Sequence, residues 1–203
     1  MAISRVPQFW LWNKIDVIEQ TTMNVKNIIT GRRTIYDFKP EPVPVEKIKQ
    51  AIDVARWAPN HHLTEPWHFY LLGPETIKSI IELNTQIIRE KDGDVAANAK
   101  QQRWSKIPGW LVVTCDKSAD QRLMQEDYAA CCCAIQNMML YLWSENIGVK
   151  WSTGKVTRDP RFFDLLWIDQ NAETVVGLFW YGYAEETPRA TRKQTEQITI
   201  ELP

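Results

Sequence analysis

The sequence lacks the short motifs that mark the commonest nucleotide-binding and hydrolytic enzymes. Its eight glycines form neither G-x-G-x-x-G nor G-x-x-x-x-G-K-[ST], which excludes a Rossmann fingerprint and a P-loop. The sequence also has no G-x-S-x-G, Cys-x-x-Cys or His-Glu-x-x-His motif, so nothing indicates an α/β-hydrolase or a zinc enzyme. A formal net charge of -1 gives no electrostatic reason to expect nucleic acid or an anionic membrane as a partner.

Long hydrophobic runs are missing as well. No apolar segment approaches the roughly 20 residues that span a bilayer. Residues 1–22 have neither the apolar core nor the small-residue cleavage site of a signal peptide. We therefore expect a cytoplasmic protein in which residues 1–22 form an extension and residues 23–203 form a single domain.

Cysteine is scarce, with four residues, and three of them are adjacent: Cys131, Cys132 and Cys133. Adjacent residues of a helix point to different faces, so these thiols cannot close on one metal ion or on each other. We interpret them as small buried hydrophobes in a reducing compartment. A redox or metal role for the run is the alternative.

Hydrophobic periodicity predicts helices at 24–31, 45–57, 75–91, 125–146 and 160–166. Aromatic and β-branched runs predict strands at 67–72, 110–115, 149–152 and 174–183. We expect the polar segment 92–107 to be a mobile helix or lid. Helices and strands do not alternate regularly, which favours an α+β sandwich. The helix at 125–146 is apolar nearly all round, so it is central or packs on a partner chain.

Three segments carry residues suited to chemistry. In the first, Arg32, Arg33 and Thr34 follow the first helix and form a good phosphate grip, because guanidinium groups match phosphate oxygens bidentately. The alternative is a solvated basic turn. In another of the three, residues 148–154 (GVKWSTG) join a strand end to a glycine turn. The hydroxyls and N–H groups of this turn can bond the edge of a heterocycle.

The second segment is a helix-to-strand loop at 57–69 that gathers tryptophan, proline and histidine. Such loops carry function more often than packing. An exposed loop histidine is the plain interpretation of His61 or His62. A metal site from His61, His62 and His68 is a further alternative, although no carboxylate or cysteine lies at a ligand spacing.

Taken in order, these segments resemble the nitroreductase family, in particular its minimal, short-chain branch. The opening RRTIYDF is similar to the R-R-S-x-R-x-F-like start of that family, and APNHHLTEPWHF is similar to its A-P-x-x-x-x-x-x-P-W-x-F loop. A long buried helix with an acidic residue near its start and a G-x-x-W-x-[ST]-G turn follow. The resemblance covers roughly residues 24–192.

The resemblance implies a three-layer α+β sandwich with a mixed, mostly antiparallel sheet flanked by helices. It implies a homodimer with FMN at the subunit interface and NADH or NADPH as co-substrate. On the flavin, hydride then passes from NAD(P)H to an electron-poor acceptor such as a nitroaromatic or a quinone, and no side chain acts as a catalytic nucleophile. The cofactor-binding residues it implies are Arg32, Arg33, Thr34, Trp57, His61, Trp151, Ser152, Thr153 and Arg192, with Trp57 and His61 supplied by the partner chain.

Departures from the family pattern leave alternatives open. Tyr36 stands where the opening motif usually has a basic residue, and Leu63 and Glu65 replace the amides of larger relatives. Other flavin chemistry on the same fold, such as dehalogenation or enone reduction, is one alternative function. A non-catalytic flavin-binding protein is another.

Overall fold

A computed structural model describes residues 24–203, and the predicted extension at 1–22 lies outside the described residues. The central element is a four-stranded sheet in the order β1-β2-β4-β3, with every neighbouring pair antiparallel. Its strands are β1 (Trp67–Leu71), β2 (Gly109–Asp116), β3 (Ile147–Ser152) and β4 (Glu173–Tyr183). The strand predictions are confirmed. The one parallel contact in this part of the chain is an isolated bridge between Thr34 and Val149.

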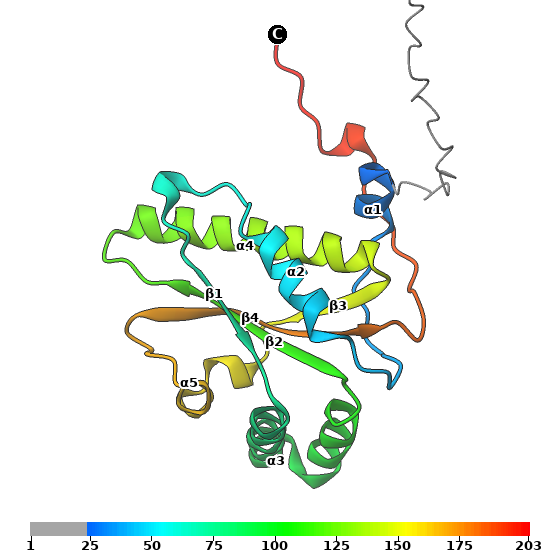
Figure 1. The fold of residues 1–203 in the computed structure, drawn as a ribbon, viewed down its shortest axis with the longest axis vertical. Coiled ribbons are helices and arrows are strands. Elements are labelled where there is room, and N and C mark those ends of the chain that lie inside the picture. Colours follow the sequence, from blue (N-terminus) through cyan, green and yellow to red (C-terminus); the bar gives the residue numbers. More distant parts are fainter. Residues whose placement is uncertain (1–23) are drawn as a thin grey trace, which may run out of the picture.

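Helices cover both faces of the sheet, so the three-layer α+β sandwich is confirmed (Figure 1). One layer holds α2 (Val45–Ala55) and α4 (Gln121–Ser144), with α1 (Val25–Gly31) against the end of α4. The other holds α3 (Pro74–Trp104) and α5 (Pro160–Leu166). Short 3-10 turns lie at His61–Leu63, Lys155–Arg158 and Thr195–Gln197.

Two apolar cores form because β2 and β4 are buried on both faces. Leu111, Val113 and Phe179 pack toward α2 and α4, whereas Trp110 and Trp180 pack toward α3 and α5. This follows from the period of two along a strand, which sends successive side chains to opposite faces. Nearly continuous apolar runs such as WLVVTC are typical of strands covered on both sides.

The long helix α4 is buried on one side only within a single chain. Ala134, Ile135 and Met138 are fully buried, but Tyr128 is 43% exposed and Cys133 is exposed. This helix was predicted to be either central in one chain or packed on a partner chain. Since one side of it is open, only a partner chain would cover the exposed apolar residues.

The segment predicted as a mobile helix or lid is helical up to Trp104 and belongs to α3. This element runs from Pro74 to Trp104 but is interrupted at Gly93, whose φ of 84° is not helical. A positive φ suits glycine because it has no Cβ. None of the helices in residues 24–203 combines the length and apolar character needed to cross a membrane.

Candidate functional site

Arg32 and Arg33 follow α1, and the charge of Arg192, from the C-terminal tail, acts on Arg32. Arg32 follows the last helical residue, and its backbone N–H donates to the carbonyl oxygen of Ile28 at 3.0 Å. The pKa of Arg32 is lowered, first by burial and then by the positive charges of Arg192 and Arg33. The other two arginines predicted to bind phosphate therefore lie within electrostatic reach of Arg32, and their binding of phosphate stays a prediction.

The charges of these arginines are not neutralised by the described part of the chain. Arg33 donates from Nη1 to the carbonyl oxygens of Thr30 (2.7 Å) and Arg32 (2.9 Å), and Arg192 donates to that of Thr191 (2.8 Å). None of the ion pairs among residues 24–203 involves Arg32, Arg33 or Arg192. Guanidinium groups without a carboxylate partner favour a bound anion, and phosphate fits their geometry best.

Thr34 is held next to β3 by an extended segment. Thr34 forms the parallel bridge with Val149, and the N–H of Ile35 donates to the Val149 carbonyl at 3.2 Å. Ile35 is fully buried, so Thr34 and Tyr36 point to the other side of this segment. Gly148 makes the close approach possible, because a Cβ there would lie 2.3 Å from Cγ1 of Ile35.

The end of β3 contributes the GVKWSTG residues. Trp151 is half-buried; its indole N–H donates to the carbonyl oxygen of Val176 at 3.0 Å, and its ring centroid lies 5.3 Å from that of Phe179. The polar atom of Trp151 is therefore engaged within the fold. The hydroxyls of Ser152 and Thr153 form no side-chain hydrogen bond among residues 24–203, which leaves them available to a ligand.

The loop between α2 and β1 has an unusual backbone. His62, Leu63 and Glu65 have φ values of 55°, 53° and 46°, a region that side-chain-bearing residues rarely adopt. Asn60 braces the loop by accepting from the Glu65 N–H at 3.0 Å and donating to the Ala58 carbonyl at 3.2 Å. Strained backbone of this kind concentrates at functional sites.

The two residues of this loop that were predicted to contact the cofactor, Trp57 and His61, lie on the surface of the chain. Trp57 is 75% exposed, and His61 is also exposed. Below them, the Thr64 hydroxyl donates to the carboxylate of Asp127 at 2.7 Å, which satisfies the acidic residue near the start of α4. A buried carboxylate needs such a partner, so this bond anchors the loop on the helix.

The metal alternative requires three histidines in one place, and the third lies elsewhere. His68 is on β1, with its Nε2 atom 2.7 Å from Oδ1 of Asp116. Across the described range no group of three or more histidine, cysteine or acidic residues is arranged to hold a metal ion.

The predicted site residues form two groups that one chain keeps apart. The loop contacts α4 at Asp127, whereas α1 meets α4 near Trp143, whose Nε1 would lie 3.3 Å from a Cβ at Gly31. Sixteen helical residues at 1.5 Å each separate these points by roughly 24 Å. In Figure 1 the loop and α1 lie at opposite ends of α4.

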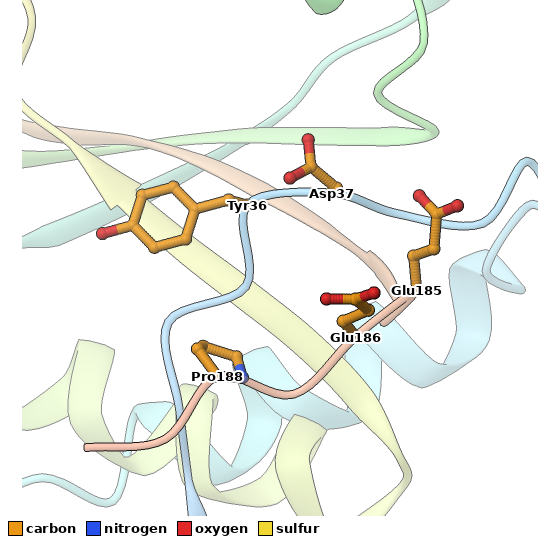
Figure 2. A pocket seen from close by; sticks show the side chains of 5 residues that line it. All are labelled: Tyr36, Asp37, Glu185, Glu186 and Pro188. Carbon is orange, nitrogen blue, oxygen red and sulfur yellow. The ribbon is translucent and has the colours of Figure 1, made fainter.

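One hollow lies next to Tyr36, and a second lies between α3 and the sheet. One cavity of about 390 Å³ is lined by Tyr36, Asp37, Glu185, Glu186 and Pro188. In Figure 2 the three carboxylates gather at one end of it, and the Tyr36 hydroxyl points away from them. A cavity lined by carboxylates is a poor place for a phosphate, so the arginine cluster is the better anion site.

The second hollow lies between α3, the end of β3 and β4 and has a volume of about 220 Å³. Its wall includes Lys150 together with Lys91, Lys100 and Lys155. The sequence analysis missed these four lysines. Lys150 could have been noticed within GVKWSTG, whereas Lys91 and Lys100 sit in a polar helix without a distinguishing pattern.

Comparison with known proteins gives consistent matches. The model of the nitroreductase family matches residues 29–183. A protein of Bacillus subtilis (strain 168) named as an NAD(P)H nitroreductase, YfhC, is 31% identical over 173 residues, covering 83% of this chain and 89% of that protein.

Two solved structures share the fold. A nitroreductase-like family protein from Bacillus cereus has a TM-score of 0.77 at 27% identity, over 89% of this chain and 96% of that chain. A Desulfovibrio desulfuricans protein, described as a nitroreductase in complex with FMN, has a TM-score of 0.70 at 18% identity, over 88% and 96%.

Proposed function

Because this chain belongs to the nitroreductase family, we propose that it is an NAD(P)H-dependent flavin oxidoreductase that binds FMN and reduces an electron-poor acceptor. The observation that carries the proposal is that the positive charges of Arg33 and Arg192 act on Arg32, while none of these arginines forms an ion pair among residues 24–203. The FMN complex of the D. desulfuricans neighbour supports the choice of cofactor.

The residues present fit FMN. The arginine cluster supplies the charge and the donors for a terminal phosphate, and Thr34 adds a hydroxyl on the same segment. Ser152 ends β3 and Thr153 follows it, next to the segment that Thr34 bridges to this strand, so in this proposal their hydroxyls are donors for the flavin ring. Trp151 contributes mainly by packing, because its N–H is bonded to Val176.

FMN, when bound, accepts hydride from NADH or NADPH and passes it to a nitroaromatic or quinone-like acceptor. The chain provides binding, orientation and electrostatics for this chemistry. Donor and acceptor use one cleft in turn, which gives ping-pong kinetics and explains why a separate dinucleotide fingerprint is unnecessary. No side chain needs to act as a nucleophile.

The functional unit is a homodimer in this proposal. Trp57 and His61 lie roughly 24 Å along α4 from the arginine cluster, so one chain cannot place all of them on one flavin. A two-fold dimer packed through the open side of α4 would cover Tyr128 and bring the loop of one chain to the arginines of the other.

We place the protein in the cytoplasm, because Cys115, Cys131, Cys132 and Cys133 are all free thiols.

The test starts from the purified protein, which should be yellow with about one FMN per chain. Anaerobic stopped-flow mixing with NADH and, separately, NADPH should bleach the flavin rapidly, and a nitroaromatic or a quinone should restore the colour. Flavin that binds but is not reduced by either nucleotide would show a flavin-binding protein instead of an enzyme. A colourless monomer that does not take up added FMN would refute the proposal altogether.

A further inference from the structure

The 220 Å³ hollow between α3, β3 and β4 has an unusual wall, and we call it the lysine pocket. It is lined by Asn84, Ile87, Ile88, Lys91, Asp92, Lys100, Trp104, Lys150, Ser152, Gly154, Lys155 and Trp180. Four of these residues carry a positive charge, and only Asp92 carries a negative one. Asp92 is already engaged, because its carboxylate lies 3.6 Å from Nζ of Lys91.

Three buried hydrogen-bond donors in this wall have no acceptor. They are Nδ2 of Asn84 and the indole N–H groups of Trp104 and Trp180, whose residues are 7%, 4% and 4% exposed. They are also all of the unpartnered buried side-chain polar atoms found among residues 24–203. A buried donor without an acceptor costs about 1–3 kcal/mol, so this wall carries polar groups that the fold itself leaves unsatisfied.

The lysines of the pocket repel one another. The pKa of Lys150 is lowered, first by burial and then by the charges of Lys100 and Arg103. The pKa of Lys155 is lowered by its contact with Lys91. Aromatic faces compensate part of this cost, since the Lys150 ammonium lies 4.5 Å from the ring centroid of Trp180 and 4.8 Å from that of Tyr36. A bound anion would relieve the remaining repulsion.

The pocket adjoins the proposed flavin site, because Ser152 and Gly154 belong to both the pocket wall and the GVKWSTG turn. At about 220 Å³ it is smaller than the roughly 300–1,000 Å³ of pockets that enclose a drug-sized ligand. It therefore accommodates a small molecule or a head group but not a whole dinucleotide.

We propose that the lysine pocket binds an anionic group of the substrate, and that the preferred acceptors are small aromatic acids whose carboxylate lies among these lysines. The role of the ligand as an acceptor rests on the proposed function, whereas the binding of an anion does not. A phosphate of NADPH has the same chemistry and is the second possible source of the anionic group.

Binding is tested first, on the flavin-loaded protein. Benzoate is titrated against tryptophan fluorescence, with benzamide as its neutral counterpart of similar shape. We expect benzoate to bind at least tenfold more tightly, and Lys150→Met or Lys100→Met to remove at least tenfold of its affinity. Lys49→Met is the matched control, because Lys49 is exposed on α2 and pairs with Glu46. Equal affinity for benzoate and benzamide would overturn the proposal.

Turnover then identifies the source of the anionic group. The ratio of kcat/KM for 4-nitrobenzoate to that for nitrobenzene should exceed ten in the wild type and fall at least tenfold in Lys150→Met. If the variant changes the ratio of KM for NADPH to that for NADH instead, the anionic group is the phosphate of the nucleotide, and the acceptor assignment is wrong. Lys155→Met provides an independent variant should either of the others fail to fold.

The two proposals can fail separately. A preparation that reduces nitrobenzene but binds benzoate no better than benzamide keeps the function and loses the pocket. One that binds benzoate through Lys150 but is never reduced by NADH or NADPH keeps the pocket as an anion site and loses the function.

Discussion

The ammonium group of Lys150 lies over the ring of Tyr36, with Nζ 4.8 Å from the ring centroid. Tyr36 occupies the position at which the family's opening motif usually has a basic residue. The neighbouring strand β3 thus brings a positive charge to the place where the first segment lacks one. The positive charge beside Tyr36 therefore comes from Lys150, a residue more than a hundred positions away in the sequence.

Lys150 should make stability depend on pH. A lowered pKa means that the folded state holds this proton less tightly than the unfolded state, so the charged form costs stability at pH 7. The cost disappears as the pH rises from the lowered pKa toward the unfolded value of about 10.4. Lys150→Met should therefore raise Tm at pH 7, and its advantage should shrink toward pH 11 in thermal denaturation followed by circular dichroism.

Lys49→Met serves as the control for that series, because its side chain is exposed and packs on no aromatic ring. A lower Tm for Lys150→Met at pH 7 would mean that the contacts with Tyr36 and Trp180 outweigh the cost of burying the charge.

Arg32→Gln should weaken FMN binding. The substitution keeps much of the side-chain length but removes a charge-assisted phosphate contact worth about 1.5–3 kcal/mol, or about ten- to hundredfold in Kd. Quenching of FMN fluorescence during titration measures the change. Arg122→Gln is the control, because Arg122 is on α4 and pairs with Glu126 at the surface. Equal FMN affinity in both variants would remove Arg32 from the site.

Two defective variants should complement each other if the site is shared between subunits. Arg32→Gln damages the arginine half, and the double substitution Trp57→Ala, His61→Ala damages the loop half. In a two-fold dimer assembled from a one-to-one mixture, about a quarter of the sites combine two intact halves. Co-expressed protein should recover about this fraction of tight FMN sites. Recovery no greater than the average of the separate variants would place both halves on the same chain.

Gly148→Ala should loosen the segment that carries Thr34. Its Cβ would lie 2.3 Å and 2.8 Å from atoms of Ile35, both too close for any side-chain carbon. Overpacking of this kind costs about 1–3 kcal/mol. We expect a lower Tm together with weaker FMN binding. Gly73→Ala is the control, because nothing lies within 4 Å of its Cβ, and its Tm should stay near that of the wild type.

Thr64→Val should destabilise the loop that carries His61. Valine keeps the shape of threonine but leaves the carboxylate of Asp127, which is 4% exposed, without its 2.7 Å hydrogen bond. An unsatisfied buried acceptor costs about 1–3 kcal/mol, measurable by urea denaturation. Thr64→Ser retains the hydroxyl and should lose much less. If both substitutions have the same effect, the methyl group of Thr64 matters more than its hydroxyl.

The fold was largely predictable because its elements have strong local patterns. The apolar runs of β2 and β4 and the helical period of α2 specify their structures directly. The boundary within α3 was harder to place, since the polar residues after Lys91 continue the helix and only Gly93 interrupts it. Local composition does not show whether a polar helix packs on the fold, which is why a mobile helix and a lid were both predicted for that segment.

The candidate site was predictable where the chemistry lies in short motifs. Arg32, Arg33 and Thr34 are adjacent in the sequence, and the charge of Arg192 acts on Arg32, while their contact with a phosphate stays a prediction. The lysine pocket could not be predicted, because its residues come from α3, β3, β4 and the turn after β3. The packing of these elements, which no local pattern encodes, brings the four lysines together.

Gly93 lies between the two parts of α3 that line the lysine pocket. Asn84 and Lys91 precede this residue, whereas Lys100 and Trp104 follow it, so the two arms of α3 approach the cavity from either side of a single nonhelical joint. The sheet holds Lys150 and Trp180, whereas the α3 side of the pocket depends on a backbone conformation that suits glycine. A side chain at position 93 would strain this joint, because residues with a Cβ rarely adopt a φ of 84°, and would thereby disturb both parts of the wall.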